Sequence, residues 1–426
     1  MHIEALDTQK EQLETLTGVV LYENRLYDLP DLFPLELFEG MGSAELATGL
    51  NKFSFIVVDP DDQPIPHVTV VCQTSSKDSQ TFTTDQQGGV TIELAIASIP
   101  VLLIRPEKNF WSTKILGRGP SDVPHRIILT PVELVACEKF SDLLGTPTVQ
   151  DGGGVVVAIV DTGISNHKNL VNVTKRVAVV DAEVMFDDLP DGIDHGTHVA
   201  GIIGSNHPEC LGQAPGAEIH SYRVCAPNSR NMTTLDVVVA ITEAVESGAD
   251  IINLSLGFSS DDSAIVEALE FALASGVLVV AASGNNGREI ASFPARMENV
   301  VSVSAIGKID AYPPDSEAAM TKAKEIADNY FVGNFCNSGE SQIQCSAPGV
   351  GVVSTVRRDG FLPRTGTSMA APMISGLSAT ILSRNRGLLG ARSPDRAQKL
   401  RAMLYNECRQ YGLAPANVGH GIPLVR

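Results

Sequence analysis

Three residues of the chain carry side chains that together can perform acyl transfer. Asp161 directly follows the apolar run VVVAIV, and His195 opens the sequence HGTHVAG. Ser368 lies in the sequence GTSMAAP, at the start of an expected helix. A serine hydroxyl attacks a carbonyl when a histidine takes its proton, and a carboxylate holds that histidine in the required tautomer. The three residues are therefore candidates for nucleophile, base and orienting carboxylate.

Each of these residues also has a more ordinary interpretation. The tripeptide Asp161-Thr162-Gly163 marks aspartic proteases too, but they need two such carboxylates, and no second Asp-Thr-Gly or Asp-Ser-Gly occurs. His195 and His198 could share a metal ion on one helical face, yet no glutamate lies between them and no third acidic ligand is evident. A serine at a helix start is most often a cap. Its surroundings are not Gly-x-Ser-x-Gly, which excludes the nucleophile elbow of α/β-hydrolases.

The elements around these residues alternate between strands and helices from about residue 134 onward. Apolar runs predict strands, at 155–160, 251–256, 277–282 and 300–306. Amphipathic patterns predict helices that end at glycines, at 235–247 and 263–275. This alternation predicts an α/β fold with a parallel sheet. In such sheets the chemistry lies beyond the carboxyl ends of the strands.

One amide side chain lies at such a strand end. Asn285 belongs to the sequence AASGNNG, just past the strand predicted at 277–282. Most strand ends that are rich in asparagine and glycine are turns. A side-chain amide at this edge can instead donate a hydrogen bond to the oxyanion of an acyl-transfer reaction.

Residues 52–133 differ in pattern from the rest of the chain. Short stretches with β-branched and alternating residues, such as HVTVVCQ and VTIELAI, are separated by turn sequences. This pattern predicts an antiparallel β-sandwich, and its layout resembles transthyretin-like or carboxypeptidase-regulatory-like domains. We therefore expect three parts, which are an N-terminal extension (1–51), a small all-β domain (52–133) and a catalytic α/β domain (134–426).

Composition argues against two classes of protein. The chain has 31 Lys and Arg against 50 Asp and Glu, which gives a net charge of −19. This balance argues against nucleic-acid binding, which needs basic surfaces. No run of about 18 apolar residues is present, so we expect no membrane-spanning segment.

The cysteines and the start of the sequence bear on cellular location. The seven cysteines are odd in number and fit no zinc-binding spacing. Cys336 and Cys345 could bridge a hairpin, but we expect reduced, partly buried thiols. The first residues lack the pattern of a secretory signal. These observations predict a cytoplasmic protein.

Taken together, the motifs resemble those of the subtilisin-like serine protease (subtilase) family. The matching sequences are VAIVDTGI (157–164), HGTHVAG (195–201) and GTSMAAP (366–372), with support from INLSLG (252–257) and SAPGVGVVST (346–355). The order Asp, His, Ser and the spacing along the chain also match. The resemblance covers roughly residues 150 to 425. It implies a three-layer fold, a parallel sheet with helices on both faces.

The resemblance implies a role for each candidate residue in a serine endopeptidase. Ser368 would attack the scissile carbonyl, His195 would transfer its proton, and Asp161 would orient the imidazole. Asn285 and the backbone N–H of Ser368 would stabilise the oxyanion. The substrate would be a protein or peptide, and catalysis would need no cofactor.

The resemblance also implies where substrate binds, and it shows departures from the family. Ser255-Leu256-Gly257 and Ala282-Ser283-Gly284 would wall the primary specificity pocket. Extended substrate would pair with the edge at Arg230-Asn231-Met232, which lacks the glycines that are common there. The loop SNHPEC (205–210) is shorter than the loop that binds calcium in many relatives, so we expect no strong calcium site. Residues 308–334 resemble an inserted, partly helical excursion.

Several alternatives remain open at this point. A peptide transpeptidase or macrocyclase would share the acyl-enzyme and exclude water from it, whereas a binding or scaffolding protein would have an inactive protease domain. The all-β domain could recruit substrate or a partner, or it could restrain the protease together with the extension until a cut in the linker near Pro131 to Gly153 releases them. The acidic residues before His195 predict a mild preference for Lys or Arg in the substrate, unless they form only a solvated loop: Asp187, Asp188, Asp191 and Asp194.

Overall fold

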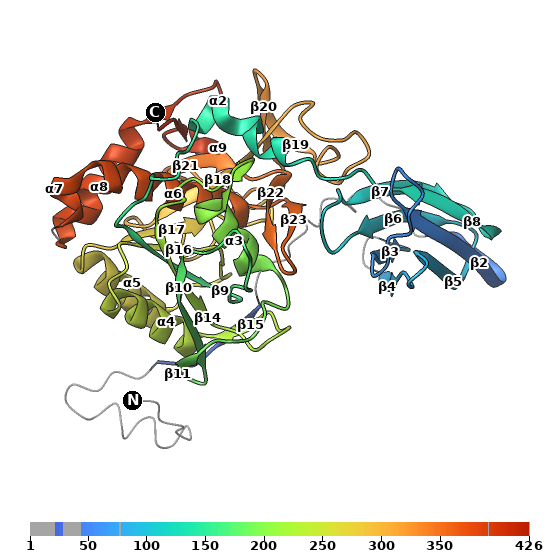
Figure 1. The fold of residues 1–426 in the computed structure, drawn as a ribbon, viewed down its shortest axis with the longest axis horizontal. Helices are drawn as coiled ribbons and strands as arrows, with labels where there is room; N and C mark the ends of the chain where they lie inside the picture. Colours follow the sequence, from blue (N-terminus) through green and yellow to red (C-terminus); the bar gives the residue numbers. More distant parts are fainter. Residues whose placement is uncertain (1–21, 29–43, 76–77, 391, 426) are drawn as a thin grey trace.

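A computed structural model describes residues 22–28, 44–75, 78–390 and 392–425 (Figure 1). In this part of the chain, the main body contains a ten-stranded sheet. Its strands, in spatial order, are β11 (Glu183–Phe186), β10 (Val173–Val180), β14 (Glu218–Arg223), β9 (Val156–Asp161), β16 (Ile251–Leu254), β17 (Leu278–Ala282), β18 (Val301–Lys308), β20 (Tyr330–Gly333) and β19 (Ala323–Ala327), with β21 (Cys345–Pro348) also paired to β18. The strands from β10 to β18 pair in parallel, as does β21 with β18. The parallel α/β sheet predicted from the sequence is therefore confirmed.

Helices cover both faces of this sheet. Strand β9 shows the reason, because its apolar side chains alternate between two buried clusters. Val157 and Ile159 belong to one cluster with residues of α3 (His195–Gly204), α6 (Thr367–Arg384) and α8 (Pro394–Asn406). Ala158 and Val160 belong to the other, with residues of α4 (Thr234–Glu246) and α5 (Ser263–Ala274). A strand without a polar face is thus buried between two helical layers.

The N-terminal strands form two smaller sheets, seen as a separate lobe in Figure 1. One sheet has the order β5 (Gly89–Ile96), β2 (Leu46–Val58), β8 (Ser121–Ile128), and the other has the order β4 (Ser79–Thr83), β3 (Thr69–Gln73), β6 (Ile99–Arg105), β7 (Thr113–Arg118). Phe53 of β2, Val70 of β3 and Ile92 of β5 share one buried cluster. The expectation of a purely antiparallel arrangement is wrong for one pair, because β2 and β8 run parallel. After β7, at the edge of the second sheet, the chain crosses to the first sheet, where β8 lies beside β2 and runs in the same direction.

One hairpin, one pair of short strands and several short elements complete the surroundings of the main sheet. Strands β22 (Val352–Val356) and β23 (Gly360–Arg364) form an antiparallel hairpin that leads into α6. Strand β1 (Leu26–Asp28) pairs antiparallel with β15 (Asn231–Thr233), just before α4. The remaining short elements are η2 (Leu134–Phe140), α2 (Ser141–Leu144), β12 (Asn206–His207), β13 (Cys210–Leu211), α7 (Arg386–Leu389), β24 (Cys408–Arg409), α9 (Pro415–Val418) and β25 (Ile422–Pro423).

The N-terminal lobe contacts the main body at two places. Asn109 donates its backbone N–H to the Phe361 carbonyl at 2.6 Å, and its Oδ1 accepts from Phe361 N at 3.0 Å. Arg105 forms a two-point ion pair with Glu317, with distances of 2.9 and 3.1 Å. The first contact reaches the β22–β23 hairpin, and the second reaches the segment 308–334.

The segment 308–334 differs from its prediction. It contains no helix, and β19 and β20 within it extend the main sheet as antiparallel strands. The expectation of a partly helical excursion is therefore wrong. Pairing of β20 with the end of β18 supplies the backbone hydrogen bonds that a helix would have satisfied internally.

The cysteines also differ from their prediction. Cys137 of η2 and Cys210 of β13 form a disulfide, with their Cα atoms 5.2 Å apart. The prediction of reduced thiols is wrong for this pair, whereas Cys336 and Cys345 are buried and are not joined to each other. The pair is separated by 73 residues in sequence, so only the fold brings the two sulfur atoms together. No helix in the described ranges is long and apolar enough to cross a membrane.

Candidate active site

Asp161 and His195 meet at the carboxyl edge of the main sheet. Asp161 is the last residue of β9, and its Oδ1 accepts a hydrogen bond from His195 Nδ1 at 2.7 Å. The same oxygen accepts from the backbone N–H of Thr162 at 2.7 Å. Both side chains are buried, at 1% and 4% exposure. Low exposure strengthens this contact, because few water molecules compete for the carboxylate.

The small residue after His195 lets the helix approach the strand end. A Cβ at Gly196 would collide with the carbonyl oxygen of Gly163 and would lie 3.2 Å from Asp161 Cβ. Gly196 N donates instead to Thr162 Oγ1 at 2.9 Å. The sequence His-Gly-Thr therefore packs the first turn of α3 directly against the Asp-Thr-Gly turn after β9.

Ser368 is the second residue of α6, which packs against α3. Its Oγ donates to the Ser255 carbonyl at 3.2 Å, and its own carbonyl accepts from Ser255 Oγ at 2.9 Å. The helix contains Pro372, which has no N–H to give to the carbonyl four residues earlier. The Ser368 carbonyl is therefore left for Ser255, one of the residues that the family resemblance assigned to the specificity pocket.

Asn285 lies beside the start of α6. Its Oδ1 accepts from Thr367 N at 2.9 Å and from Thr367 Oγ1 at 2.8 Å. A Cβ built on Gly366 would lie 3.2 Å from Asn285 Nδ2, which places this nitrogen next to the turn before Ser368. Because the backbone N–H of Thr367 can only donate, the amide is oriented with Nδ2 as its remaining donor.

The two predicted pocket walls lie at the same edge of the sheet. Ser255-Leu256-Gly257 follows β16 directly, and Ala282-Ser283-Gly284 begins at the last residue of β17. Gly284 N donates to Thr367 Oγ1 at 3.1 Å, which joins this second wall to α6. The structure thus brings the six predicted pocket residues to the strand ends next to Ser368.

The acidic residues before His195 do not form a solvent-facing rim. Asp187 pairs with Arg223 at 2.9 Å, and Asp194 pairs with Arg357 at 3.0 Å. Asp191 is fully buried, and only Asp188 of this group is exposed. The predicted preference for basic substrate residues therefore loses its structural basis, because three of the four carboxylates are already bound within the protein.

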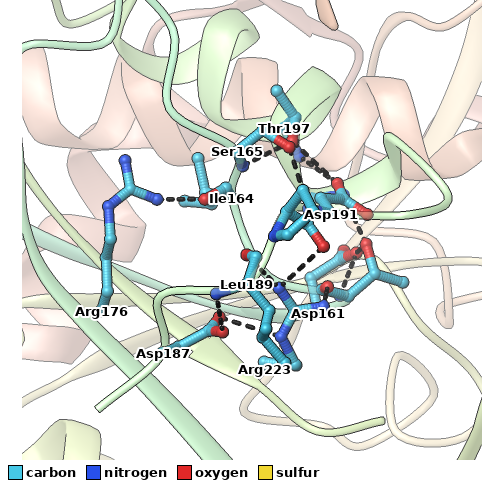
Figure 2. A network of polar contacts seen from close by, with 12 residues as sticks. Asp161, Ile164, Ser165, Arg176, Asp187, Leu189, Asp191, Thr197 and Arg223 are labelled. Carbon is cyan, nitrogen blue, oxygen red and sulfur yellow. Dashed lines mark hydrogen bonds and ion pairs between the residues drawn. The ribbon is translucent and has the colours of Figure 1, made fainter. Parts of the chain in front are cut away.

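Sequence reasoning missed the network that surrounds Asp161 (Figure 2). Arg223, the last residue of β14, is 1% exposed and donates to the Leu189 carbonyl at 2.9 Å and to the Thr162 carbonyl. Asp191 accepts from the backbone N–H and the hydroxyl of Thr197, at 2.9 and 2.8 Å. One feature of the sequence could have indicated the role of Asp191. In the spacing Asp-x-x-x-His-Gly-Thr, this acidic residue lies just before the residues that begin the helix, where a carboxylate can accept from free backbone N–H groups.

Burial controls the charge of the groups around the site. It raises the pKa of the Asp191 carboxyl, with a further rise from the Asp161 charge, while hydrogen bonds from Thr197 oppose the change. Burial also holds the pKa of His198 well below its usual range. His198 Nε2 donates to the Leu362 carbonyl at 2.8 Å. His198 therefore has a structural partner, which weakens the alternative in which it shares a metal ion with His195.

Two observations bear on whether the protein binds a metal ion or a cofactor. In the family that the sequence resembles, catalysis needs no cofactor and structural calcium is common. Within the ranges that the structure describes, no group of three or more His, Cys, Asp or Glu side chains could hold a metal ion.

Relatives of the chain are secreted proteases. Alkaline elastase YaB from Bacillus sp. (strain YaB) is 35% identical over 236 residues, which is 55% of this chain and 56% of that protein. Subtilisin BL from Lederbergia lenta is 34% identical over 55% of this chain and 78% of its own length. Subtilisin DY from Bacillus licheniformis is 32% identical over 62% of this chain and 85% of its own length. The chain thus spans a little over half the length of the elastase.

The prediction of a cytoplasmic location is wrong. The subtilisins to which the chain is similar are extracellular proteins. The Cys137–Cys210 disulfide is consistent with an extracellular location, because disulfides persist in oxidising compartments. The start of the sequence and the odd number of cysteines gave a misleading indication.

The family model covers the whole predicted site. The model that matches is the one described as the subtilase family (Peptidase_S8), and it matches residues 152–421 of this chain. This range includes Asp161, His195, Asn285 and Ser368 together with the main sheet and its helices. The chain therefore belongs to the subtilase family.

Proposed function

We propose that this chain hydrolyses peptide bonds with Ser368 as nucleophile, His195 as general base and acid, and Asp161 as the orienting carboxylate. The observation that carries the proposal is the 2.7 Å hydrogen bond from His195 Nδ1 to the buried Asp161. A neutral imidazole that donates from Nδ1 has its lone pair on Nε2. That tautomer is the one a general base for the serine needs.

The reaction has two halves. Ser368 Oγ leaves its hydrogen bond to the Ser255 carbonyl and attacks the scissile carbonyl, while His195 Nε2 takes the hydroxyl proton. The C–N bond then breaks as the imidazolium gives this proton to the leaving amine, and an acyl-enzyme remains on Ser368. A water molecule, deprotonated by His195, hydrolyses the ester and restores the serine.

Two donors would stabilise the oxyanion in each half. Asn285 Nδ2 is the first, since Oδ1 of the same amide is held by Thr367. The backbone N–H of Ser368 is the second, because it belongs to the first turn of α6 and has no carbonyl partner within the helix. Donors fixed in advance favour the transition state, in which the negative charge develops.

Substrate would bind as an extended protein or peptide segment along the carboxyl edge of the sheet. The walls of the primary pocket would be Ser255-Leu256-Gly257 and Ala282-Ser283-Gly284. The hydrogen bonds that join Ser255 and Gly284 to the start of α6 support this assignment, because they fix both walls relative to the nucleophile.

We also propose the three-part organisation expected from the sequence, with an extension at 1–51, a transthyretin-like β-sandwich at 52–133 and a catalytic domain at 134–426, except that strand β2 of the sandwich already begins at Leu46. The apolar cluster shared by the two N-terminal sheets supports the sandwich. The contacts of Asn109 with Phe361 and of Arg105 with Glu317 favour a sandwich that stays attached to the protease. Such a module could recruit a substrate or partner protein.

The extension has a different relation to the protease. Strand β1 pairs with Asn231–Thr233, and Tyr27 pairs with Met232 of the edge assigned above to extended substrate. The Tyr27 ring lies 4.2 Å from the Phe258 ring, and its hydroxyl donates to Asp262 at 2.9 Å. These contacts support a restraining role for residues 22–28. N-terminal sequencing of active protein tests this, since full activity with Met1 intact would contradict obligatory release.

The nucleophile is tested by Ser368→Ala and by labelling with a fluorophosphonate. Ser368→Ala should lose turnover by on the order of 10⁶-fold, as for related triads, and should lose the label. The masses of the products separate hydrolysis, which adds one water, from peptide ligation, which adds none. Near-normal cleavage by Ser368→Ala would show that the assignment is wrong.

A further inference from the structure

The first turn of α3 receives its cap from outside the helix. Asp194 occupies the N-cap position, but its backbone is left-handed, with φ of 61°, and its side chain makes no capping hydrogen bond. The Asp194 carboxylate is held by Arg357 instead, at 2.8 Å from the backbone N–H and 3.0 Å from Nε. Another acceptor must therefore satisfy the free N–H groups at the start of this helix.

Asp191 supplies that acceptor. Its Oδ2 accepts from Thr197 N at 2.9 Å, the third residue of α3, and from Thr197 Oγ1 at 2.8 Å. Its Oδ1 accepts from Asp194 N at 2.9 Å and from Ile193 N at 3.2 Å. Four donors therefore converge on one carboxylate that has no exposed surface. These hydrogen bonds favour the ionised form of Asp191, because each of its oxygens accepts two of them and donates none.

The cap fixes the backbone that carries His195. Gly196 N donates to Thr162 Oγ1 on the strand side. Thr197 N donates to Asp191 on the loop side, as Figure 2 shows. His195 precedes both residues and reaches back to Asp161. Movement of the first turn would lengthen this 2.7 Å contact and change the direction of Nε2.

Asp191 is also a second buried carboxyl group close to Asp161. Several charged or ionisable groups face the pair, from the loop before α3 (Asp194), from β23 (Arg364) and from the segment after β14 (Cys225). Arg364 donates to the Ile193 carbonyl at 3.0 Å. A negative charge at this position would favour the imidazolium that forms when His195 takes the serine proton.

We propose that Asp191 is a positioning residue for His195, which caps α3 as a carboxylate and holds the imidazole against Asp161. The proposal rests on the endopeptidase function proposed above. It deepens that function, because it assigns to Asp191 a contribution to turnover rather than to substrate binding.

The test compares Asp191→Asn with Asp250→Asn. An asparagine at 191 can accept from only two of the four donors and turns its amide N–H groups toward the others. We expect kcat to fall by about 10- to 100-fold with KM nearly unchanged, since small misplacements of catalytic groups have effects of this size. The acidic limb of the kcat/KM profile should move to lower pH, because the imidazolium loses a nearby negative charge.

Asp250 is the matched control at the other end of the sheet. It is 3% exposed, accepts from Val156 N at 2.9 Å and pairs with Arg396 at 2.8 Å. Asp250→Asn should lower stability but keep kcat and the pH profile. Activity is expressed per site labelled by fluorophosphonate, so a loss of folded protein is counted separately. Absence of labelling in the unaltered protein would contradict the endopeptidase function itself, whereas the comparison of variants concerns Asp191 alone.

A second pair of variants keeps the proposal testable if Asp191→Asn does not fold. Thr197→Val removes the hydroxyl that donates to Asp191, and Thr197→Ser retains it. We expect kcat to fall several-fold in the valine variant and to recover in the serine variant. An unchanged kcat and pH profile in Asp191→Asn, or equal losses in both Thr197 variants, would overturn the proposal.

Discussion

Asn285 offers the sharpest test of the proposed oxyanion hole, because its two amide atoms have separate tasks. Oδ1 accepts from Thr367 N and Oγ1, at 2.9 and 2.8 Å, and Nδ2 remains to bind the oxyanion. Asn285→Ala removes both tasks. The loss of one oxyanion donor costs about 10²–10³ in kcat, or about 2.7–4 kcal/mol, a range known from subtilisin and therefore borrowed from a relative of this chain.

The same substitution also leaves Thr367 without its acceptor. Thr367 is fully buried, so each donor left unpaired should cost about 1–3 kcal/mol of stability. Asn285→Asp separates the two effects, because one carboxylate oxygen can still accept from Thr367 while the other replaces the amide nitrogen. We expect kcat to fall at least as far in the aspartate variant as in the alanine variant.

Asn337→Asp is a suitable control for the aspartate variant. Asn337 is also buried, its Oδ1 accepts from Asn286 N at 3.0 Å, and its Nδ2 donates to Ser292 at 3.1 Å. The assay measures kcat and KM with a peptide substrate, per site labelled by fluorophosphonate, and thermal unfolding in the inactive Ser368→Ala background. The reasoning is refuted if Asn285→Asp keeps kcat within about threefold of the unaltered protein, or if only KM changes.

Two further predictions concern stability. Replacing both Cys137 and Cys210 by alanine should lower the free energy of unfolding by up to about 4 kcal/mol, since the disulfide joins residues 73 positions apart; an unchanged Tm in the Ser368→Ala background would contradict this. Burial holds the pKa of His198 well below its usual range, so the unfolded chain binds a proton there that the folded chain does not. The free energy of unfolding should therefore fall as pH drops below about 6.5, by up to about 1.4 kcal/mol per pH unit. His198→Gln should reduce this slope in urea unfolding at pH 5 to 8, and an equal slope in both proteins would argue against the assignment.

The central sheet was predictable because its pattern is local. The run at 155–160 has no polar face, which indicates a strand between two layers, and Asp161 follows it at the edge where such sheets place their chemistry. In the same way, the sequence GTSMAAP predicted that Ser368 lies at the start of a helix. The structure places both residues where those local patterns required, at the end of β9 and at the start of α6.

Contacts between distant segments were not predictable in the same way. Arg223 reads as an ordinary polar residue in the strand Glu218–Arg223, yet it is buried against Asp187, which lies 36 residues earlier. The acidic group before His195 looked like a charged surface because its partners, Arg223 and Arg357, are remote in sequence. The Cys137–Cys210 pair was hidden for the same reason, since cysteine number and spacing alone carry no pairing information.

The proline of GTSMAAP shows how a motif residue can matter without touching substrate. Pro372 lies inside α6, where a proline usually weakens a helix by removing a hydrogen bond to the residue four positions earlier. Here that earlier residue is Ser368, and its carbonyl accepts from Ser255 Oγ at 2.9 Å instead. Because Ser368 Oγ in turn donates to the Ser255 carbonyl, the two serines are joined in both directions. The carbonyl left free by the proline thus links the residue after β16 to the nucleophile, so two reciprocal hydrogen bonds position the pocket wall and the reacting hydroxyl together.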